Sequence, residues 1–526
     1  MELHSYPVLL TSACVAVTCA IVLFTDRFAM PRELQRKSRP KRTIPEWLAD
    51  TVARICVIIL IYAAFFAISW RPIYAAQASI SFFVIFTGIS RAKLNFIREP
   101  LLFSDIALVA DVFKYKDIFY ATSLNILFWI VALLYVFGAS GLYMWMEPHL
   151  LPGTWPLLWI IAMLSLAFGP WLALFNAWIN HPVHALVYKL VPQPQVKSDT
   201  ARFGTFTSVV LHFILWLGFK RSEIVDAIAL RLASAIDHFW LHESHSSAPL
   251  VVVWQSESFI DLRHFGVTVN LPHLDAMRAT ASQWGRMTSV FEGGYTLRTE
   301  FAVLSGLLPQ NVGVDAGLPY LRASHYKDVV WPQRLKSAGW GTTFIHPYDK
   351  TFFFRHKALP QLGFDEMVML DSFEHIPTKT EPYVSDMELA KVVVQRVAES
   401  DNQKAFFFVG SMANHGPWEP GRCGSVGTPL EIYKGLLEKA DEALGYLVAQ
   451  LNQLNRPVWL LFYGDHAPLL KSFADPFPDP RTDYFIVPLG EASRGSMERV
   501  ASIEEAPWKL IDKLLEHASL KRELPG

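Results

Sequence analysis

The stretch RPVWLLFYGDHAP, residues 456–468, joins a continuous apolar run of strand length to a polar ending. An apolar run of this kind, without alternation, is typical of a strand buried on both faces of a parallel sheet. Gly464 allows a tight turn after the strand. Asp465 and His466 then follow as two adjacent side chains of the types that bind metal ions.

Three further apolar runs also end in polar residues. They are PLVVVWQSES (249–258), which reaches Glu257, GTTFIHPYD (341–349), which reaches His346, and KAFFFVGSMANHGPW (404–418), which reaches His415. Helical patterns separate the runs, which predicts βαβ units and a mainly parallel sheet sandwiched by helices. Ligands bind at the carboxyl ends of the strands in such sheets, so we expect the four endings to converge on one site.

Each ending also has a purely structural explanation. A single Glu after a strand is commonly a cap or a solvated turn residue, and a single His is no more specific. The combination is more informative than any member. Glu257, Asp465 and His466 together offer a mixed oxygen and nitrogen ligand set that suits manganese, magnesium or zinc.

A second motif, FEGGYTLRTEF at residues 291–301, stands directly before a helical pattern. Its two glycines permit close backbone approach, and Thr296 lies at or just before the helix N-terminus, where unpaired N–H groups favour an anion. Thr296 could simply cap the helix, with Glu300 in the first turn. A hydroxyl beside a divalent cation can instead lose its proton and attack phosphorus, which makes Thr296 a candidate nucleophile.

Apolar segments are concentrated in the first 220 of the 526 residues, and 52% of the chain is hydrophobic. The net charge of -1 does not favour nucleic acid as a partner. We expect a transmembrane domain at 1–220 with five to six helices, an interfacial linker helix at 221–247 and an extracytoplasmic catalytic domain at 248–526. The expected spans lie near 7–25, 52–70, 73–90, 121–145 and 155–178. A shorter segment at 205–219 is either a sixth span or an interfacial or buried helix.

Charged loops predict the orientation of these spans. Basic residues crowd between Arg27 and Arg42 and between Arg91 and Lys116, so both loops are expected on the cytoplasmic side. The loop MEPHLLPGT (146–154) has no Lys or Arg and suits the outer side. The N-terminus is then outside, and a sixth span delivers the C-terminal domain outside. Without a sixth span, the domain faces the cytoplasm or the charge pattern is broken.

Six short motifs occur in the order found in one family. They are QSES with Glu257, GGYTLRTEF with Thr296, FFFRHKALPQLGFDE with Arg355, YVSDMEL with Ser385 and Asp386, ANHGP with His415, and YGDHAP with Asp465 and His466. Over about residues 248–490 the chain resembles the lipoteichoic acid synthase-like phosphoglycerol transferases of the alkaline phosphatase and sulfatase superfamily. Members of the teichoic acid type usually have five spans and an inside N-terminus, which conflicts with the charge pattern.

The resemblance implies an enzyme of the bacterial inner (cytoplasmic) membrane with its catalytic domain outside. It would take phosphoglycerol from a phosphatidylglycerol-type lipid onto its threonine and pass it to a glycan or glycerolphosphate polymer. One divalent ion is implied, manganese first, with magnesium or zinc also compatible. Glu257, Thr296, Asp465 and His466 match the family's metal site, His346, Arg355 and His415 match its substrate contacts, and Phe353 stands where the family often has Trp.

The same resemblance implies catalytic roles for three residues. Thr296 attacks the phosphodiester, and Arg355 stabilises the charge on the phosphate oxygens. His415 is the candidate for protonating the leaving oxygen and later activating the acceptor hydroxyl. His415 could alternatively serve only as a hydrogen-bond partner of the phosphate.

Other functions are weighed against this one. A sulfatase needs Cys or Ser at the nucleophile position, which TLRTE does not supply. A phosphoethanolamine transferase also uses threonine, but that branch typically braces its ectodomain with disulfides, and Cys423 is the only cysteine after residue 56. A non-catalytic sensor or polysaccharide export partner would have no need to keep Thr296 together with its ligands.

Overall fold

The computed structural model describes residues 5–115, 126–226, 228, 248–291, 293–400, 403–493 and 501–520. The chain divides into two compact units, Met1–Phe219 and Lys220–Gly526. We call them the membrane unit and the α/β unit. Most of the predicted linker helix at 221–247 lies outside the described residues, although residues 221–226 are helical.

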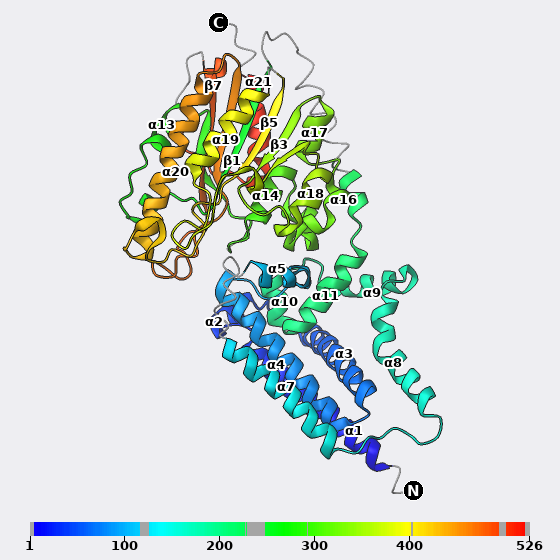
Figure 1. Ribbon diagram of the computed structural model, residues 1–526. Helices are drawn as coiled ribbons and strands as arrows, with labels where there is room; N and C mark the ends of the chain where they lie inside the picture. Colours follow the sequence, from blue (N-terminus) through cyan, green and yellow to red (C-terminus); the bar gives the residue numbers. More distant parts are fainter. Residues whose placement is uncertain are drawn as a thin grey trace. The chain divides into compact units, whose positions relative to one another are not determined.

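Long apolar helices make up most of the membrane unit (Figure 1). Its α-helices are α1 (Ser5–Thr25), α2 (Arg32–Ser38), α3 (Ile44–Ser69), α4 (Pro72–Ile97), α5 (Val109–Lys114), α7 (Ile126–Met146), α8 (Pro156–Ala173), α9 (Ala177–Leu190), α10 (Val196–Phe203) and α11 (Thr205–Gly218). Four of the described helices, α1, α3, α4 and α8, are long and apolar enough to cross a membrane. Helix α7 has 21 residues and is the fifth long apolar helix. The predicted multi-span helical domain is confirmed.

Helix α11 favours a buried helix over a sixth span at 205–219. Its 14 residues rise about 21 Å, whereas the hydrocarbon core is about 30 Å thick. The helix is buried inside the unit, with the ring of Phe206 4.9 Å from Phe82 in the middle of α4 and the ring of Phe213 6.2 Å from Phe103. The even number of crossings, on which the predicted outside N-terminus depended, therefore lacks its sixth span.

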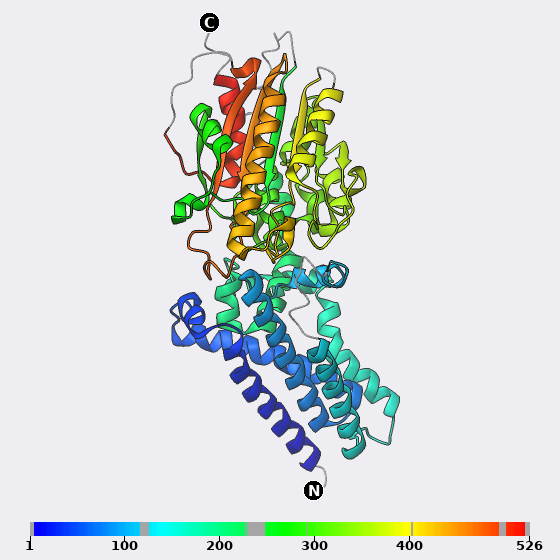
Figure 2. The ribbon, with the colours of Figure 1, turned by 60° about the vertical axis from the view of Figure 1, so that its left-hand side comes forward.

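The loops of the membrane unit gather at two ends. Helix α2, within the basic stretch Arg27–Arg42, packs against α10, and α5 lies at the same end in Figures 1 and 2. The loop 146–154 lies at the opposite end beside the turn between α3 and α4, where the N–H of Leu150 donates to the carbonyl of Trp70 at 2.7 Å. The two basic loops thus share one end of the unit.

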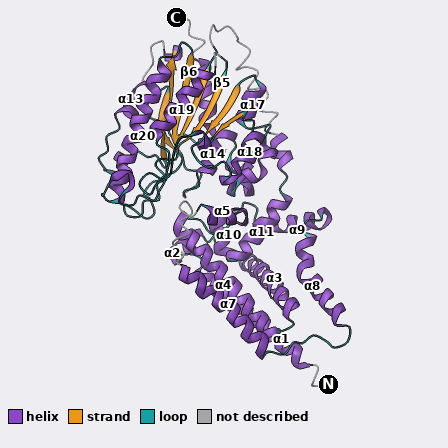
Figure 3. Ribbon diagram, in the orientation of Figure 1, coloured by secondary structure: helices purple, strands orange, loops and turns teal. Residues whose placement is uncertain are grey.

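A seven-stranded sheet forms the centre of the α/β unit (Figure 3). Its strands are β1 (Leu250–Ser256), β2 (Gln283–Met287), β3 (Gly341–Ile345), β4 (Glu366–Val368), β5 (Ala405–Gly410), β6 (Pro457–Gly464) and β7 (Thr482–Gly490), in the spatial order β2-β7-β6-β1-β5-β3-β4. Strands β6, β1, β5, β3 and β4 are parallel neighbours, and only β7 pairs antiparallel, with β6 and β2. The predicted mainly parallel sheet is confirmed.

Helices cover both faces of this sheet, as predicted (Figures 1 and 2). They are α13 (Pro272–Thr280), α14 (Thr296–Ser305), α15 (Pro309–Val312), α16 (Ala323–Tyr326), α17 (Trp331–Ser337), α18 (Arg355–Gln361), α19 (Asp386–Glu399), α20 (Pro429–Asn452) and α21 (Leu510–Leu520). The core on one face joins Leu274 of α13, Val393 of α19 and Leu447 of α20 to Val252 of β1. On the other face α17 packs on β3, α21 packs on β6, and α14 contacts both helices. Side chains of the central strands are buried on both faces, which explains their continuous apolar runs.

Candidate active site

The strand register brings the endings of β1 and β6 together. Ser256 pairs with Gly464, so Glu257 and Asp465 follow side by side at the carboxyl edge of the sheet. Gly464 is required here because a Cβ at this position would lie only 2.0 Å from the carbonyl oxygen of Phe259. The glycine therefore permits a close approach of two chain segments next to the site.

The ending of β3 reaches the same edge. Ile345 pairs with Val409 of β5, and Nδ1 of the next residue, His346, lies 2.9 Å from the carbonyl oxygen of Gly410. Burial and the positive charge of Arg355 lower the pKa of His346 well below its usual range. The ring is therefore neutral, with its proton on Nδ1 and the Nε2 lone pair free to accept.

Glu257, Asp465 and His466 form one buried cluster. Their ligand atoms all lie within 4.8 Å of one another. His466 Nε2 lies 3.5 Å from Glu257 Oε1 and 3.4 Å from Asp465 Oδ2. Three side chains that come from two distant parts of the chain thus point at one small space.

Hydrogen bonds behind the cluster orient its members. Asp465 Oδ1 accepts from the backbone N–H groups of Ser258 at 2.7 Å and His466 at 2.8 Å, which leaves Oδ2 facing the cluster. His466 Nδ1 lies 3.1 Å from the carbonyl oxygen of Ala467. That contact favours the proton on Nδ1 and turns the Nε2 lone pair towards the two carboxylates, as in metal-binding histidines.

The charges of this cluster fit a divalent cation. Glu257 and Asp465 are each only 2% exposed, and no Arg or Lys forms an ion pair with either among the described residues. Burial, together with the charge of Glu257, raises the pKa of Asp465 to about 7. Two buried carboxylates without a cationic partner are unfavourable, and two oxygens with one imidazole nitrogen are ligands that Mn²⁺, Mg²⁺ or Zn²⁺ accept.

Thr296 is the first residue of α14, and its hydroxyl faces the cluster. Oγ1 donates to Glu257 Oε2 at 3.2 Å and lies 3.5 Å from His466 Nε2. The alternative that Thr296 caps the helix is wrong, because Tyr295 occupies the N-cap position and no side chain makes the capping bond. A Cβ on Gly294 would lie 3.6 Å from His466, so this loop passes close to the cluster.

Arg355, the first residue of α18, is held by a buried acid. The guanidinium is 1% exposed and the carboxylate of Glu300 is fully buried. Nη2 donates to Glu300 Oε2 at 2.9 Å and Nε to Oε1 at 3.3 Å, while Nη1 lies 3.3 Å from His346 Nε2. Tyr320 donates its hydroxyl to Glu300 Oε1 at 2.5 Å. Two of the three guanidinium nitrogens are therefore committed to Glu300.

Phe353 connects the arginine to the loop before α14. Its backbone has a φ angle of 55°, which residues other than glycine rarely adopt. The ring centroid lies 5.6 Å from Arg355 Cζ and 6.1 Å from the ring of Tyr295. The aromatic side chain thus packs between the segments that carry Arg355 and Thr296, in the place where a Trp was expected from the family pattern.

His415 lies in the loop after β5 and is partly exposed. Its Nδ1 lies 2.7 Å from the carbonyl oxygen of Gly416 and 3.3 Å from the hydroxyl of Tyr383, and Nε2 has no hydrogen-bond partner in the described part of the chain. Burial is the largest of the causes that lower the pKa of His415 to about 4. The neutral ring is suited to accepting a proton at Nε2, whereas donating one requires an added charge nearby.

Two buried acids were not assigned a role from the sequence. Glu300 had no signal beyond its place in a first helical turn. Asp386 follows Ser385, the N-cap of α19, and an acid at this position is common in ordinary helices. Burial raises the pKa of Asp386 to about 7, and the residue lies beside Ser411, whose Oγ accepts from the backbone N–H of Glu257 at 3.0 Å.

A second cluster, Asp261, His264 and Asp483, has metal-type side chains but a different charge environment. Arg278 donates to Asp261 at 2.6 Å and to Asp483 at 2.7 Å, and Arg263 binds Asp261 at 2.9 Å. These guanidinium groups already neutralise the carboxylates. The cluster is therefore a structural ion-pair network rather than a cation site.

The fold and the site together define a class of α/β enzyme, with a hydroxyl at a helix N-terminus facing acid and imidazole groups at the carboxyl edge of a parallel sheet. The sulfatase family model matches residues 249–511, and the chain belongs to the sulfatase family. The predicted membership of the alkaline phosphatase and sulfatase superfamily is confirmed, and the protein is a membrane protein with a sulfatase-type enzyme domain.

Known proteins resemble both units. The chain is 58% identical to the capsular polysaccharide biosynthesis protein RkpI of Rhizobium meliloti, over 99% of this chain and 97% of that protein. The lipooligosaccharide phosphoethanolamine transferase A of Neisseria meningitidis has the same overall fold, with a TM-score of 0.50, 11% identity and 95% of each chain covered. The phosphoglycerol transferase GacH of Streptococcus pyogenes, solved with sn-glycerol-1-phosphate, matches at a TM-score of 0.45 and 22% identity over 57% of this chain and 82% of that chain.

Proposed function

We propose that the protein moves a phosphoglycerol group from a phosphatidylglycerol-type lipid, through a covalent intermediate on Thr296, to an extracytoplasmic glycan. The observation that carries this proposal is the position of Thr296 Oγ1, 3.2 Å from Glu257 and 3.5 Å from His466 at the start of α14. The motif resemblance supports the phosphoglycerol donor. The name of the 58% identical relative, a capsular polysaccharide biosynthesis protein, supports a glycan acceptor.

The cluster of Glu257, Asp465 and His466, with Thr296, would hold one divalent ion, manganese in our proposal. Such an ion would favour loss of the hydroxyl proton and would offset negative charge on the phosphate. The protein groups supply the rest. The N-terminus of α14 favours an anion, and Arg355, fixed by Glu300, offers its guanidinium to the phosphate oxygens.

The first half of the reaction transfers the headgroup to the protein. The Thr296 hydroxyl passes its proton to Glu257 Oε2, to which it donates at 3.2 Å, and Oγ1 forms a bond to phosphorus. The bond from phosphorus to the diacylglycerol oxygen breaks, and that oxygen takes up a proton. We propose that His415 delivers this proton from Nε2. Its ring is neutral near neutral pH because burial lowers its pKa to about 4, and the negative charge of a bound phosphate would raise that pKa.

The second half releases the group to the acceptor. His415 Nε2 accepts the proton of an acceptor hydroxyl, the acceptor oxygen bonds to phosphorus, and the bond to Thr296 Oγ1 breaks. Phe353 and His346 complete the proposed headgroup contacts. Phe353 packs against the arginine, and His346 orients it through the 3.3 Å contact to Nη1.

The proposal is tested by trapping the intermediate. Purified protein is incubated with phosphatidylglycerol without acceptor, and the peptide containing Thr296 is analysed by mass spectrometry. A glycerophosphate adduct on Thr296, absent in Thr296→Ala and in a sample given phosphatidylcholine, is expected. An ethanolamine phosphate adduct formed from phosphatidylethanolamine in its place would transfer the assignment to the ethanolamine branch. No adduct with either lipid, in protein saturated with manganese, would contradict a covalent mechanism.

We also propose that the α/β unit lies outside the cytoplasmic membrane. Five long helices place the N-terminus and the α/β unit on opposite sides, so the N-terminus is then cytoplasmic, contrary to the orientation expected from loop charges. Cys423 is the only cysteine of the α/β unit, which makes it a specific probe once Cys14, Cys19 and Cys56 are replaced by Ala. Labelling of Cys423 in intact spheroplasts by a membrane-impermeant maleimide is expected, and labelling only after lysis would contradict the orientation.

A further inference from the structure

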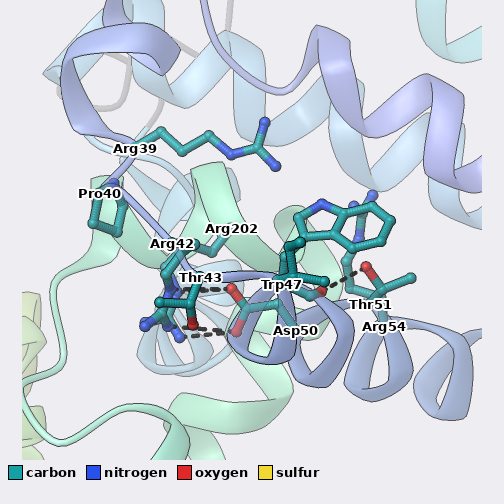
Figure 4. Close-up of a pocket in the computed structure, with 10 residues that line it drawn as sticks. Arg39, Pro40, Arg42, Thr43, Trp47, Asp50, Thr51, Arg54 and Arg202 are labelled. Carbon is teal, nitrogen blue, oxygen red and sulfur yellow. Dashed lines mark hydrogen bonds and ion pairs between the residues drawn. The ribbon is translucent and has the colours of Figure 1, made fainter.

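The basic end of the membrane unit contains a pocket of about 390 Å³ (Figure 4). Arg39, Arg42, Arg54 and Arg202 line it, together with Asp50. Two adjoining hollows, of about 360 and 740 Å³, also include Arg39 in their walls. Across the three hollows seven arginines but only two carboxylates, Asp26 and Asp50, line the walls. We call this region the arginine pocket.

Three of these arginines are already neutralised. Arg202 binds Asp50 at 3.0 Å, and Arg54 binds Asp26 at 2.6 Å. Arg42 lies 3.4 Å from Asp50 and donates as well to Glu46, at 3.2 Å. These ion pairs lie on one side of the pocket, where Figure 4 shows the dashed contacts around Asp50.

The other four arginines have no acidic partner. Arg27, Arg32, Arg39 and Arg91 form no ion pair with any residue that the structure describes, and Arg27 lies only over the ring of Phe24, at 5.6 Å. In Figure 4 the guanidinium of Arg39 extends over the pocket and no dashed line reaches it. Several cations thus converge with no acidic partner among the described residues, and a bound anion would balance their charge.

The walls of the pocket are apolar where the long helices begin. Phe24 and Phe28 at the end of α1 are 55% and 60% exposed, and Trp47 at the start of α3 is 50% exposed. These side chains line the same hollows as the arginines. Trp is enriched at the level of the lipid headgroups, which fits Trp47, and Phe24 and Phe28 give acyl chains an apolar surface directly beside the cations.

We propose that the arginine pocket binds the phosphate of an anionic phospholipid, with its acyl chains along the aromatic wall. A basic pocket between transmembrane helices matches the chemistry of such a headgroup, because Arg binds phosphate oxygens in a bidentate manner. A small soluble anion would need the arginines but not the exposed aromatic wall. The pocket belongs to the membrane unit alone, so the proposed lipid binding does not depend on whether Thr296 carries phosphoglycerol.

The test compares two double variants that remove the same charge. Arg32→Gln/Arg39→Gln removes unpaired cations of the pocket, whereas Arg36→Gln/Lys37→Gln removes two exposed cations of the same helix that do not line it. Full-length protein is titrated with phosphatidylglycerol or phosphatidylcholine in detergent, and binding is followed by native mass spectrometry. Thermal melting checks that both variants remain folded.

Wild-type protein and the Arg36/Lys37 variant are expected to retain phosphatidylglycerol in preference to phosphatidylcholine. The Arg32/Arg39 variant should bind it about tenfold more weakly or worse. Equal loss in the two variants would show diffuse attraction to a charged surface and would overturn the proposal. So would displacement of the lipid by millimolar glycerol phosphate, which indicates a site for free phosphate, or binding of acidic polysaccharide in place of lipid.

Discussion

Two regions of the protein carry uncompensated charge of opposite sign. At the edge of the sheet Glu257 and Asp465 converge with one imidazole, and no Arg or Lys among the described residues forms an ion pair with either carboxylate. In the arginine pocket unpaired cations, Arg39 among them, converge without enough carboxylates. The first arrangement requires a cation and the second an anion. Charge balance alone therefore separates a metal site from a phosphate site.

Burial separates the two regions further. The carboxylates at the sheet edge are each 2% exposed, whereas Arg39 is exposed to solvent. Electrostatic interactions are strong and little screened in a buried site, and weak and salt-dependent at a surface. Changes at the sheet edge should therefore have large effects, and changes at the arginine pocket moderate ones.

The largest expected effect follows removal of the cation from the sheet edge. Asp465→Asn, or exhaustive dialysis against a chelator, should lower the rate of phosphoglycerol transfer to the acceptor by at least about 10³-fold. The reason is that the Thr296 hydroxyl is then no longer activated by a cation. Headgroup transfer is measured by thin-layer chromatography with lipid labelled in glycerol. Adding back Mn²⁺, Mg²⁺ or Zn²⁺ separately to the dialysed protein identifies the metal.

The matched control is Asp261→Asn in the arginine-compensated cluster. It alters a buried acid of the same unit without touching the proposed metal ligands, so metal dependence of transfer should persist. Lipid binding at the arginine pocket should survive chelation unchanged. If chelation left transfer intact while abolishing lipid binding, the assignment of the two regions would have to be exchanged.

The strand endings could be predicted from the sequence because a parallel sheet has a simple geometry. Runs such as 249–258 and 456–468 are apolar throughout, and their order along the chain already places Glu257 and Asp465 at one edge. Thr296 followed from the glycines before a helix. Local patterns of this kind show where a strand or helix ends and therefore which side chains lie at the edge of the sheet.

Contacts between distant side chains could not be predicted. Glu300 reads as an ordinary helix residue, and only the fold shows that it binds Arg355, 55 residues further on. The arginine pocket could not be predicted for the same reason: the number of basic residues between Arg27 and Arg42 indicates a side of the membrane, but not which of these residues lack an acidic partner. The length of the 205–219 segment was ambiguous until its burial was known.

Glu300→Gln tests whether a buried ion pair positions the arginine. The change leaves Arg355 buried without a counter-charge, which is strongly destabilising for a pair of this kind. Transfer should fall about 100-fold, mainly in kcat, because the guanidinium is no longer fixed for the transition state. Kinetics on the folded fraction, with melting temperature measured in parallel, separate the two effects.

The control for this variant is Asp275→Asn, which disrupts the ion pair with Arg263 at a site where Asp275 is 51% exposed. Such exposed pairs contribute at most about 1 kcal/mol. Near-normal kcat in Asp275→Asn and a reduced one in Glu300→Gln are expected. Equal kcat in the two variants would contradict a positioning role for Glu300.

Salt should affect the two regions unequally. Raising ionic strength from about 0.1 M to about 0.5 M shortens the Debye length below the spacing of charges in an exposed pocket. Phosphatidylglycerol binding at the arginine pocket should weaken by several-fold up to about tenfold. Metal retention at the buried cluster, measured by elemental analysis after gel filtration, should change little. Equal salt dependence would remove the distinction between a buried and an exposed region.

The smallest expected effect is that of pH, and it depends on His415. Its pKa is lowered to about 4, below the usual value for His of about 6.5, so the neutral ring persists down to weakly acidic pH. In the half-reaction that uses His415 as a base, kcat/KM for the acceptor should rise only about twofold between pH 4 and pH 6 and then stay flat, whereas an ordinary His would give a rise continuing above pH 6. His415→Gln should lower the plateau and abolish the rise. A rise in kcat/KM centred near pH 6.5 would show that the pKa of His415 is not lowered or that another group limits the reaction.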